Sequence, residues 1–107
     1  MPQPTHLERQ LGLIKGLVAD RAYHYSRKVR QCIEDGWYGA ADLERCILTA
    51  TRIHKVEDDE LQVAVDGYKY TILGRDTCGQ AFYSCGKVIL SQNDERLYFF
   101  ITAHEAR

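Results

Sequence analysis

The sequence lacks a long apolar run. Its apolar stretches are short and interrupted by Lys, Asp or Gly, whereas a membrane-spanning helix needs about 18 or more consecutive apolar residues. Residues 1–4 also lack the basic and then apolar layout of a signal peptide. These absences argue against a membrane protein and predict a cytoplasmic one.

The chain also lacks an excess of charge of one sign. Its 14 Lys and Arg against 15 Asp and Glu leave a formal net charge of −1, so the chain as a whole does not carry the positive charge of a dedicated nucleic-acid binder. A local basic patch is still compatible with this balance. No low-complexity or Ser/Pro-rich linker divides the 107 residues, which predicts a single domain over residues 1–107.

No pair of cysteines has the close Cys-x-x-Cys spacing of most structural zinc sites. The four cysteines are Cys32, Cys46, Cys78 and Cys85. In a chain without an export signal they are expected to be free thiols that behave as small apolar side chains. We therefore predict no metal site and no cofactor, with a redox or metal role for Cys78 and Cys85 as the open alternative.

The first half of the chain has helical periodicity, because apolar residues recur every three or four positions. Three segments show this pattern: residues 5–22, 23–35 and 40–51. Thr5 and Glu8 match a capping box at the start of the first segment, and Gly36 suits the left-handed end of the second. The sequence leaves open whether the second helix continues the first or begins anew near residue 23.

After Arg52 the periodicity changes to that of strands. Five strands are expected, over residues 53–56, 61–65, 68–73, 80–90 and 96–104. Asp66-Gly67 is a favoured two-residue hairpin signal, and Gly86 predicts a kink in the fourth strand. The predicted fold class is therefore α+β, with about three N-terminal helices packed on one face of a roughly five-stranded, mainly antiparallel sheet.

Strand alternation divides the last strand into two faces. The row expected to meet the helices is Leu97, Phe99, Ile101 and Ala103. The row expected to face outward is Tyr98, Phe100, Thr102 and His104. An outward row with two aromatic rings would be an exposed apolar surface, so we predict it as the working face of the protein.

Short motifs in this chain resemble domain-of-unknown-function family 4258. In order, they are Tyr25-Ser26-Arg27-Lys28-Val29-Arg30, Gly67-Tyr68-Lys69-Tyr70-Thr71-Ile72, Gly74-Arg75-Asp76 and Phe100-Ile101-Thr102-Ala103-His104-Glu105. The similarity makes residues 23–107 the family-like core and residues 1–22 an additional N-terminal helix. The family is similar in layout to the small RelE and BrnT ribonuclease toxins, so the resemblance implies a toxin-like fold that lays RNA on an open sheet face.

The resemblance also implies site residues. RNA cleavage needs a base for the ribose 2′-hydroxyl, a cation for the phosphorane charge and an acid for the leaving oxygen. The catalytic candidates are His104, Lys69 and Arg75, and the candidates for RNA or partner binding are Arg27, Lys28, Arg30, Tyr98 and Phe100. His6 and His54 belong to no cluster in the sequence.

The chain departs from the family at one helical pair. Where a histidine followed four residues later by arginine is expected, this chain has Lys28 and Cys32. Two hypotheses therefore stay open. The chain is either an RNA-binding or RNA-cleaving toxin-like domain with a cognate antitoxin-like partner, its nuclease activity retained or degenerate, or a non-enzymatic module for protein interaction or homodimerisation.

Overall fold

The computed structural model describes residues 4–106 and confirms the α+β class, with three helices and a five-stranded mixed sheet in that range. The elements are α1 (Pro4–Ala19), β1 (Tyr23–Tyr25), α2 (Arg27–Glu34), α3 (Ala40–Thr49), β2 (Ile53–Asp58), β3 (Tyr68–Arg75), β4 (Ala81–Leu90) and β5 (Arg96–Glu105). Within the described range no helix is long and apolar enough to cross a membrane.

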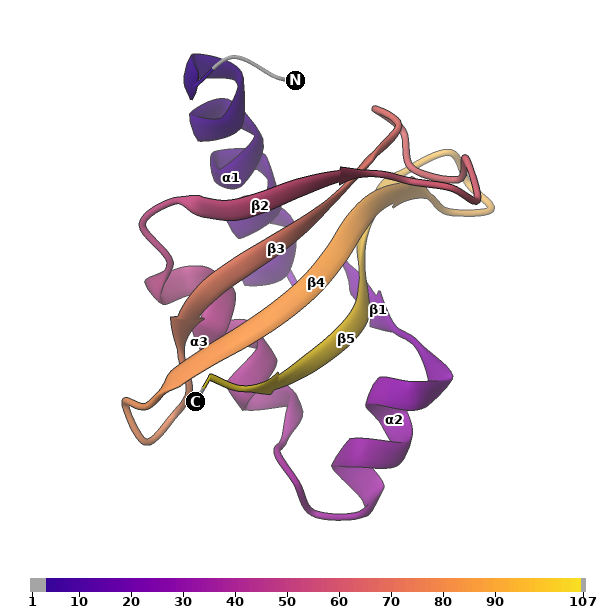
Figure 1. The fold of residues 1–107 in the computed structure, drawn as a ribbon. Helices are drawn as coiled ribbons and strands as arrows, with labels where there is room; N and C mark the ends of the chain where they lie inside the picture. The colour runs from indigo at the N-terminus through magenta and orange to yellow at the C-terminus, as the bar shows by residue number, and fades with distance from the viewer. Residues whose placement is uncertain (1–3, 107) are drawn as a thin grey trace.

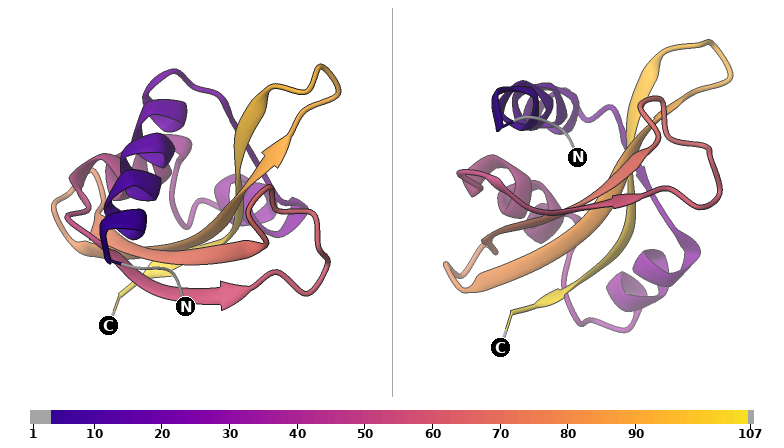
Figure 2. Two further views of the ribbon diagram at one scale, coloured as in Figure 1. Left: turned by 90° about the horizontal axis from the view of Figure 1, so that it is seen from above. Right: turned by 45° about the horizontal axis from the view of Figure 1, so that its top comes forward.

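The sheet has helices behind it and an open face in front. Its strand order is β1-β5-β4-β3-β2, in which β1 runs parallel to β5 and the other pairs are antiparallel. Helices α1 and α3 cover one face, whereas α2 lies beside the β5 edge, as Figures 1 and 2 show. The opposite face of β2, β3, β4 and β5 carries no helix (Figure 1).

The core follows the apolar stripes of α1 and α3. Leu11, Ile14 and Val18 are buried on α1, and α3 contributes its own buried stripe to the same cluster. Helix α3 approaches β3 so closely that a Cβ on Gly74 would lie 1.8 Å from the Cys46 carbonyl oxygen. A glycine at this position is therefore required for the helix layer to pack on the sheet.

The segment around β1 differs from the prediction. Residues 23–25 were expected to be helical, but they form a strand that pairs with Tyr98–Phe100 of β5. The Ser26 hydroxyl then accepts a hydrogen bond from the Val29 amide and donates one to the Ile101 carbonyl. This cap starts α2 at Arg27 and ties it to β5. The predicted left-handed conformation of Gly36 is confirmed by its φ of 81°.

The predicted strand over residues 61–65 is also wrong, because residues 59–67 form a loop. The Asp59 carboxylate accepts hydrogen bonds from the Val63 and Ala64 amides, which therefore do not join a strand ladder. Strand β2 pairs directly with β3 instead, with Asp58 opposite Tyr68. Asp66-Gly67 thus closes this longer loop rather than a two-residue hairpin.

A β-bulge changes the two faces of β5. Phe100 pairs with Gly86 and Thr102 pairs with Cys85, so Ile101 is an extra residue that reverses the alternation. Tyr98 and Phe100 are consequently fully buried against the helices, and the prediction that they face outward is wrong. Beyond the bulge the prediction is confirmed: Ala103 is buried, and Thr102 and His104 lie on the open face.

Gly86 explains why Tyr98 turns inward. A Cβ at Gly86 would lie 2.5 Å from the Cζ and Oη atoms of Tyr98. The tyrosine ring therefore occupies the space that any other residue at position 86 would fill. The predicted irregularity at Gly86 is confirmed, since the register of β4 and β5 shifts between Cys85 and Gly86.

A candidate acid–base site on the open sheet face

Strand register assembles polar side chains into rows across the open face. One row is Lys55, Thr71, Cys85 and Thr102, and the next is Leu73, Tyr83 and His104. The second row is extended by His54, which lies at an irregularity in β2 between Ile53 and Lys55. Ile53 is buried in the core, and this irregularity lets both His54 and Lys55 line the open face.

Two imidazoles flank one tyrosine in this row. The ring centroid of Tyr83 lies 5.4 Å from that of His54 and 5.6 Å from that of His104. His54 is the second residue of β2 and His104 the ninth residue of β5, and both are exposed to solvent. Register alone therefore brings together two groups that are fifty residues apart in the sequence.

Both imidazoles line one cleft of about 300 Å³ on the open face. The cleft also contains the hydroxyl groups of Thr71 and Thr102, and Lys55, whose ammonium group lies 3.8 Å from the carboxylate of Glu57 in the same cleft. A volume of this size is at the lower end of the range of roughly 300–1,000 Å³ that small-ligand sites occupy. The cleft thus offers acid–base groups, hydrogen-bonding groups and a cation to a single ligand.

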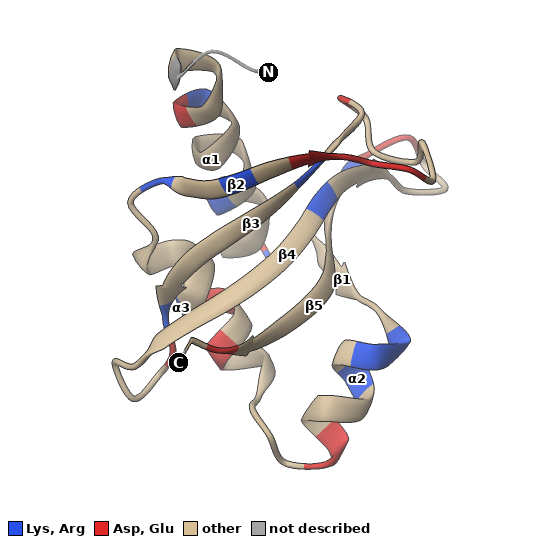
Figure 3. Cartoon of the chain, viewed as in Figure 1, with Lys and Arg blue, Asp and Glu red and all other residues tan. Residues whose placement is uncertain are grey.

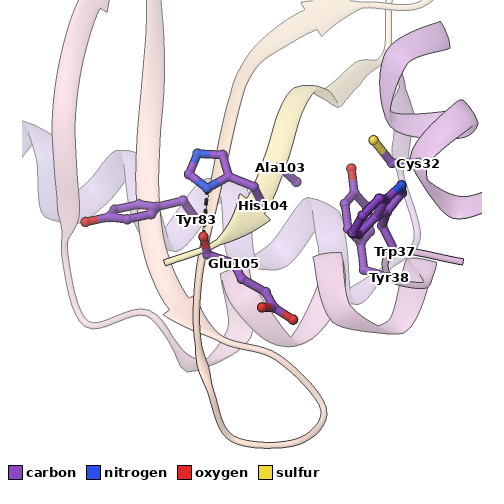
Figure 4. Close-up of a pocket in the computed structure, with 7 residues that line it drawn as sticks. All are labelled: Cys32, Trp37, Tyr38, Tyr83, Ala103, His104 and Glu105. Carbon is purple, nitrogen blue, oxygen red and sulfur yellow. Dashed lines mark hydrogen bonds between the residues drawn. The ribbon is translucent and has the colours of Figure 1, made fainter. Parts of the chain in front are cut away.

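The orientation of His104 is fixed by its neighbour. His104 Nδ1 lies 2.9 Å from the Glu105 carbonyl oxygen (Figure 4). Because a carbonyl oxygen only accepts hydrogen bonds, Nδ1 donates and Nε2 is the acceptor nitrogen of the neutral ring. His104 can therefore take up a proton at Nε2.

Cys85 in the same cleft is poorly suited to nucleophilic chemistry. Burial raises the pKa of its thiol, and the opposing effects of Thr71 and Lys69 are smaller. The thiol form therefore predominates at neutral pH, whereas nucleophilic attack requires the thiolate. All four cysteines are free thiols, as predicted, but Cys78 is exposed and so does not behave as a small buried apolar side chain. Within residues 4–106 no three side chains among His, Cys, Asp and Glu are placed to hold a metal ion.

The predicted catalytic residues are only partly brought together. His104 lines the cleft, and Lys69 lies on the same face of the sheet opposite Glu57. Arg75 is at the end of β3, where its guanidinium donates a hydrogen bond to the Gly79 carbonyl at 2.8 Å. Arg75 is not among the cleft residues. His54 lines it instead, although nothing near it in the sequence marks it as a site residue.

The predicted binding residues separate into two groups. Arg27, Lys28 and Arg30 are exposed on the first turns of α2, which Figure 3 shows as a basic segment beside β5. The Arg30 guanidinium lies over the Tyr25 ring, 5.7 Å from its centroid. Tyr98 and Phe100 are buried beneath the sheet and are not accessible to a ligand.

Comparison with protein-family models, with curated proteins and with solved structures found no match. The similarity to family 4258 therefore stays a prediction. The chemistry of the open face must be inferred from its own residues, of which the two histidines around Tyr83 are the most distinctive.

Proposed function

We propose that the protein binds single-stranded RNA on its open sheet face and cleaves it with His54 and His104 as the acid–base pair. The observation that carries this proposal is the placement of both imidazoles around Tyr83 in one solvent-open cleft. Histidine is the side chain that most often serves as a general acid or base, so of two such groups one can accept a proton while the other donates one.

The geometry supports one assignment of roles. His104 Nε2, the acceptor nitrogen, takes the proton of a ribose 2′-hydroxyl, and the oxygen attacks the adjacent phosphorus. The 5′-oxygen of the next nucleotide leaves and takes a proton from the His54 imidazolium. The products are a 2′,3′-cyclic phosphate and a 5′-hydroxyl end. Lys55, which lines the same cleft, offsets the negative charge that develops on the phosphorane oxygens.

A path for a longer strand is present next to the cleft. Ser26, which caps α2, donates a hydrogen bond to the Ile101 carbonyl of β5 at 2.7 Å. The basic residues that follow it therefore lie beside the strand that carries His104 (Figure 3). Cations here can hold the flanking phosphates of an RNA strand that crosses β5, which predicts binding that weakens as salt rises.

The ribose 2′-hydroxyl provides the direct test. A short single-stranded RNA and a matched strand with one 2′-deoxyribonucleotide are incubated with the protein in EDTA at low salt. We expect cleavage of the RNA with a 2′,3′-cyclic phosphate end, and protection of the bond that follows the deoxyribonucleotide. Equal cleavage of both strands, or no cleavage of either, would reject the proposal.

Exposed apolar side chains on the loop after β2 and at the end of β4 favour a second candidate function, self-association. Leu61, Val63, Val65 and Leu90 are all exposed, and the Val65 amide bonds to the Val88 carbonyl, which joins the loop to β4. Acidic residues surround this loop (Figure 3). The basic start of α2 in a second copy of the chain would complement them. Sedimentation of the protein and of Leu61→Asp tests this: a monomer in both cases would reject it.

A further inference from the structure

A second and larger cleft adjoins the histidine cleft. Its volume is about 630 Å³, and it shares Tyr83 and His104 with the first. Figure 4 shows it between the end of β5 and the segment that joins α2 to α3, where Trp37 and Tyr38 lie. A ligand in the first cleft can therefore extend directly into the second.

One wall of this cleft is an unpaired strand edge. Strand β1 pairs with β5 only along Tyr98–Phe100. Beyond the bulge, the Ala106 amide donates a hydrogen bond to the Ala81 carbonyl at 3.0 Å, so the backbone groups of Ala106 point toward β4. Because these groups alternate in direction along an antiparallel strand, those of Ala103 and Glu105 point away from β4. These groups face the cleft, and because the Glu105 carbonyl already accepts a hydrogen bond from His104 Nδ1, the groups left to bind the polar edge of a ligand are the Ala103 N–H and C=O and the Glu105 N–H. The edge is too short to add a peptide strand of ordinary length.

The opposite wall is aromatic. The Trp37 side chain is 74% exposed, so its ring face is open for a planar ligand to stack on. Tyr38, the next residue, packs edge-on against Phe82, with ring centroids 5.3 Å apart. Burial raises the pKa of Tyr38, and the nearby Cys32 thiol raises it further. Tyr38 Oη makes no hydrogen bond to a described residue. Tyr38 is therefore a neutral part of this wall that is held by Phe82.

The charge of the cleft selects against phosphate. Among the described residues that line this cleft, none is Lys or Arg, and the one permanently charged side chain is the carboxylate of Glu105. A carboxylate only accepts hydrogen bonds. A neutral planar ring with donors on its edge fits this lining, and guanine is the nucleobase whose N1–H and N2–H donors are adjacent.

We propose that this cleft binds a nucleobase with a preference for guanine, stacked on Trp37 and hydrogen-bonded to Glu105 and the free edge of β5. The role of this cleft as an RNA subsite rests on the proposed function. In that role, the bound guanine would lie on the 5′ side of the phosphate at which the histidines cleave. Stacking of a base on an exposed aromatic ring is common in proteins that bind single strands.

Trp37 is the one tryptophan of the chain, so its fluorescence reports on the cleft directly. The protein is titrated with GMP, AMP, CMP, UMP and ribose 5-phosphate. We expect GMP to quench Trp37 with an affinity at least about tenfold above that of UMP, because each good hydrogen-bonded pair discriminates by about that factor or more. Ribose 5-phosphate should have no effect. Equal quenching by ribose 5-phosphate, or none by GMP, would overturn the inference.

Two variants separate the parts of this site. Glu105→Gln should reduce the preference for GMP over UMP to less than about threefold, since the amide presents donors as well as an acceptor. Trp37→Ala should weaken GMP binding, measured by calorimetry, by about tenfold or more. Leu48→Ala, which also removes an exposed apolar side chain but lies outside both clefts, should bind GMP as the wild type does. Equal affinities for the Trp37 and Leu48 variants would reject stacking.

The same titration distinguishes this inference from the proposed function, because GMP binding requires no cleavage. His54→Ala, which alters only the first cleft, should abolish RNA cleavage and retain GMP quenching. If GMP quenches Trp37 but wild-type protein leaves RNA intact, the nuclease proposal fails and the base site stands. If RNA is cleaved but GMP does not quench, the base site fails.

Discussion

Lys87 Nζ lies 3.0 Å from Asp59 Oδ1, and the two side chains are only 6% and 3% exposed. The same carboxylate accepts hydrogen bonds from the Val63 and Ala64 amides. This buried ion pair fixes the loop over residues 59–67 against β4. It also neutralises Lys87, so that Lys69 and Lys55, which forms an exposed pair with Glu57, are the more accessible cations of the open face.

Removal of the Asp59 charge is predicted to destabilise the fold strongly. Asp59→Asn leaves the Lys87 ammonium buried without its counterion, which costs about 3–5 kcal/mol of unfolding free energy. The matched control is Glu57→Gln, which breaks the exposed pair between Lys55 and Glu57, 3.8 Å apart. That change should cost less than about 1 kcal/mol. Urea unfolding at pH 7 measures both, and similar small losses would contradict the role of the buried pair.

The contribution of Asp59 should also depend on pH. Burial by itself would raise its pKa, but the Ala64 amide, the Lys87 ammonium and the Val63 amide together lower it to about 2 from an ordinary 3.8. Because the folded-state pKa is depressed, the stabilisation is complete above the unfolded pKa and is lost as pH falls from 3.8 toward 2. The stability difference between wild type and Asp59→Asn should shrink in this window, whereas a constant difference would contradict it.

Two glycines should respond to alanine in opposite directions. At Gly74 a Cβ would collide with the backbone of Cys46 in α3, so Gly74→Ala should cost about 1–3 kcal/mol or more. At Gly12 in α1 no heavy atom lies within 4 Å of the added Cβ. Gly12→Ala should therefore stabilise by up to about 1 kcal/mol through helix propensity. Thermal unfolding measures both, and two shifts of the same sign would be inconsistent with this packing.

Two fully buried tyrosines provide a similar contrast. Tyr70 Oη donates a hydrogen bond to the Asp66 carboxylate, whereas Tyr98 Oη makes no hydrogen bond to a described residue. Tyr70→Phe should cost about 1–3 kcal/mol, because a charge-assisted bond is lost. Tyr98→Phe should be neutral or stabilising, because a buried unsatisfied hydroxyl is removed. Chemical denaturation decides this, and a larger loss for Tyr98→Phe would refute the assignment.

The helices and the long strands could be predicted from the sequence because their patterns are local. The apolar stripe of Leu43, Cys46 and Ile47 predicts the buried face of α3, and all three are fully buried. Strand β1 has only three residues, too few for a period, and it is held by backbone pairing with a strand more than seventy residues away. No local signal distinguishes such a segment from the start of the following helix.

The site was harder to predict than the fold, because strand parity carries no information about bulges. One extra residue, Ile101, reverses the faces of β5 and buries Tyr98 and Phe100. His54 is isolated in the sequence because Tyr83 and His104 belong to two other strands. Only the pairing of the strands brings the three side chains into one row. Thr102 and His104 follow the bulge and face outward as predicted. Tyr98 and Phe100 precede it and therefore face the opposite side.

The four histidines of the chain provide a sharp test of RNA cleavage by the pair on the sheet face. His54 and His104 line the cleft, whereas His6 and His24 are exposed outside it. The measurement is the rate of cleavage of a single-stranded RNA by each His→Ala variant. Loss of a general acid or base lowers the rate by about 10²–10⁴-fold, so His54→Ala and His104→Ala should fall by that factor while His6→Ala and His24→Ala match the wild type. Equal rates in all four variants would contradict the assignment of His54 and His104 as the acid–base pair.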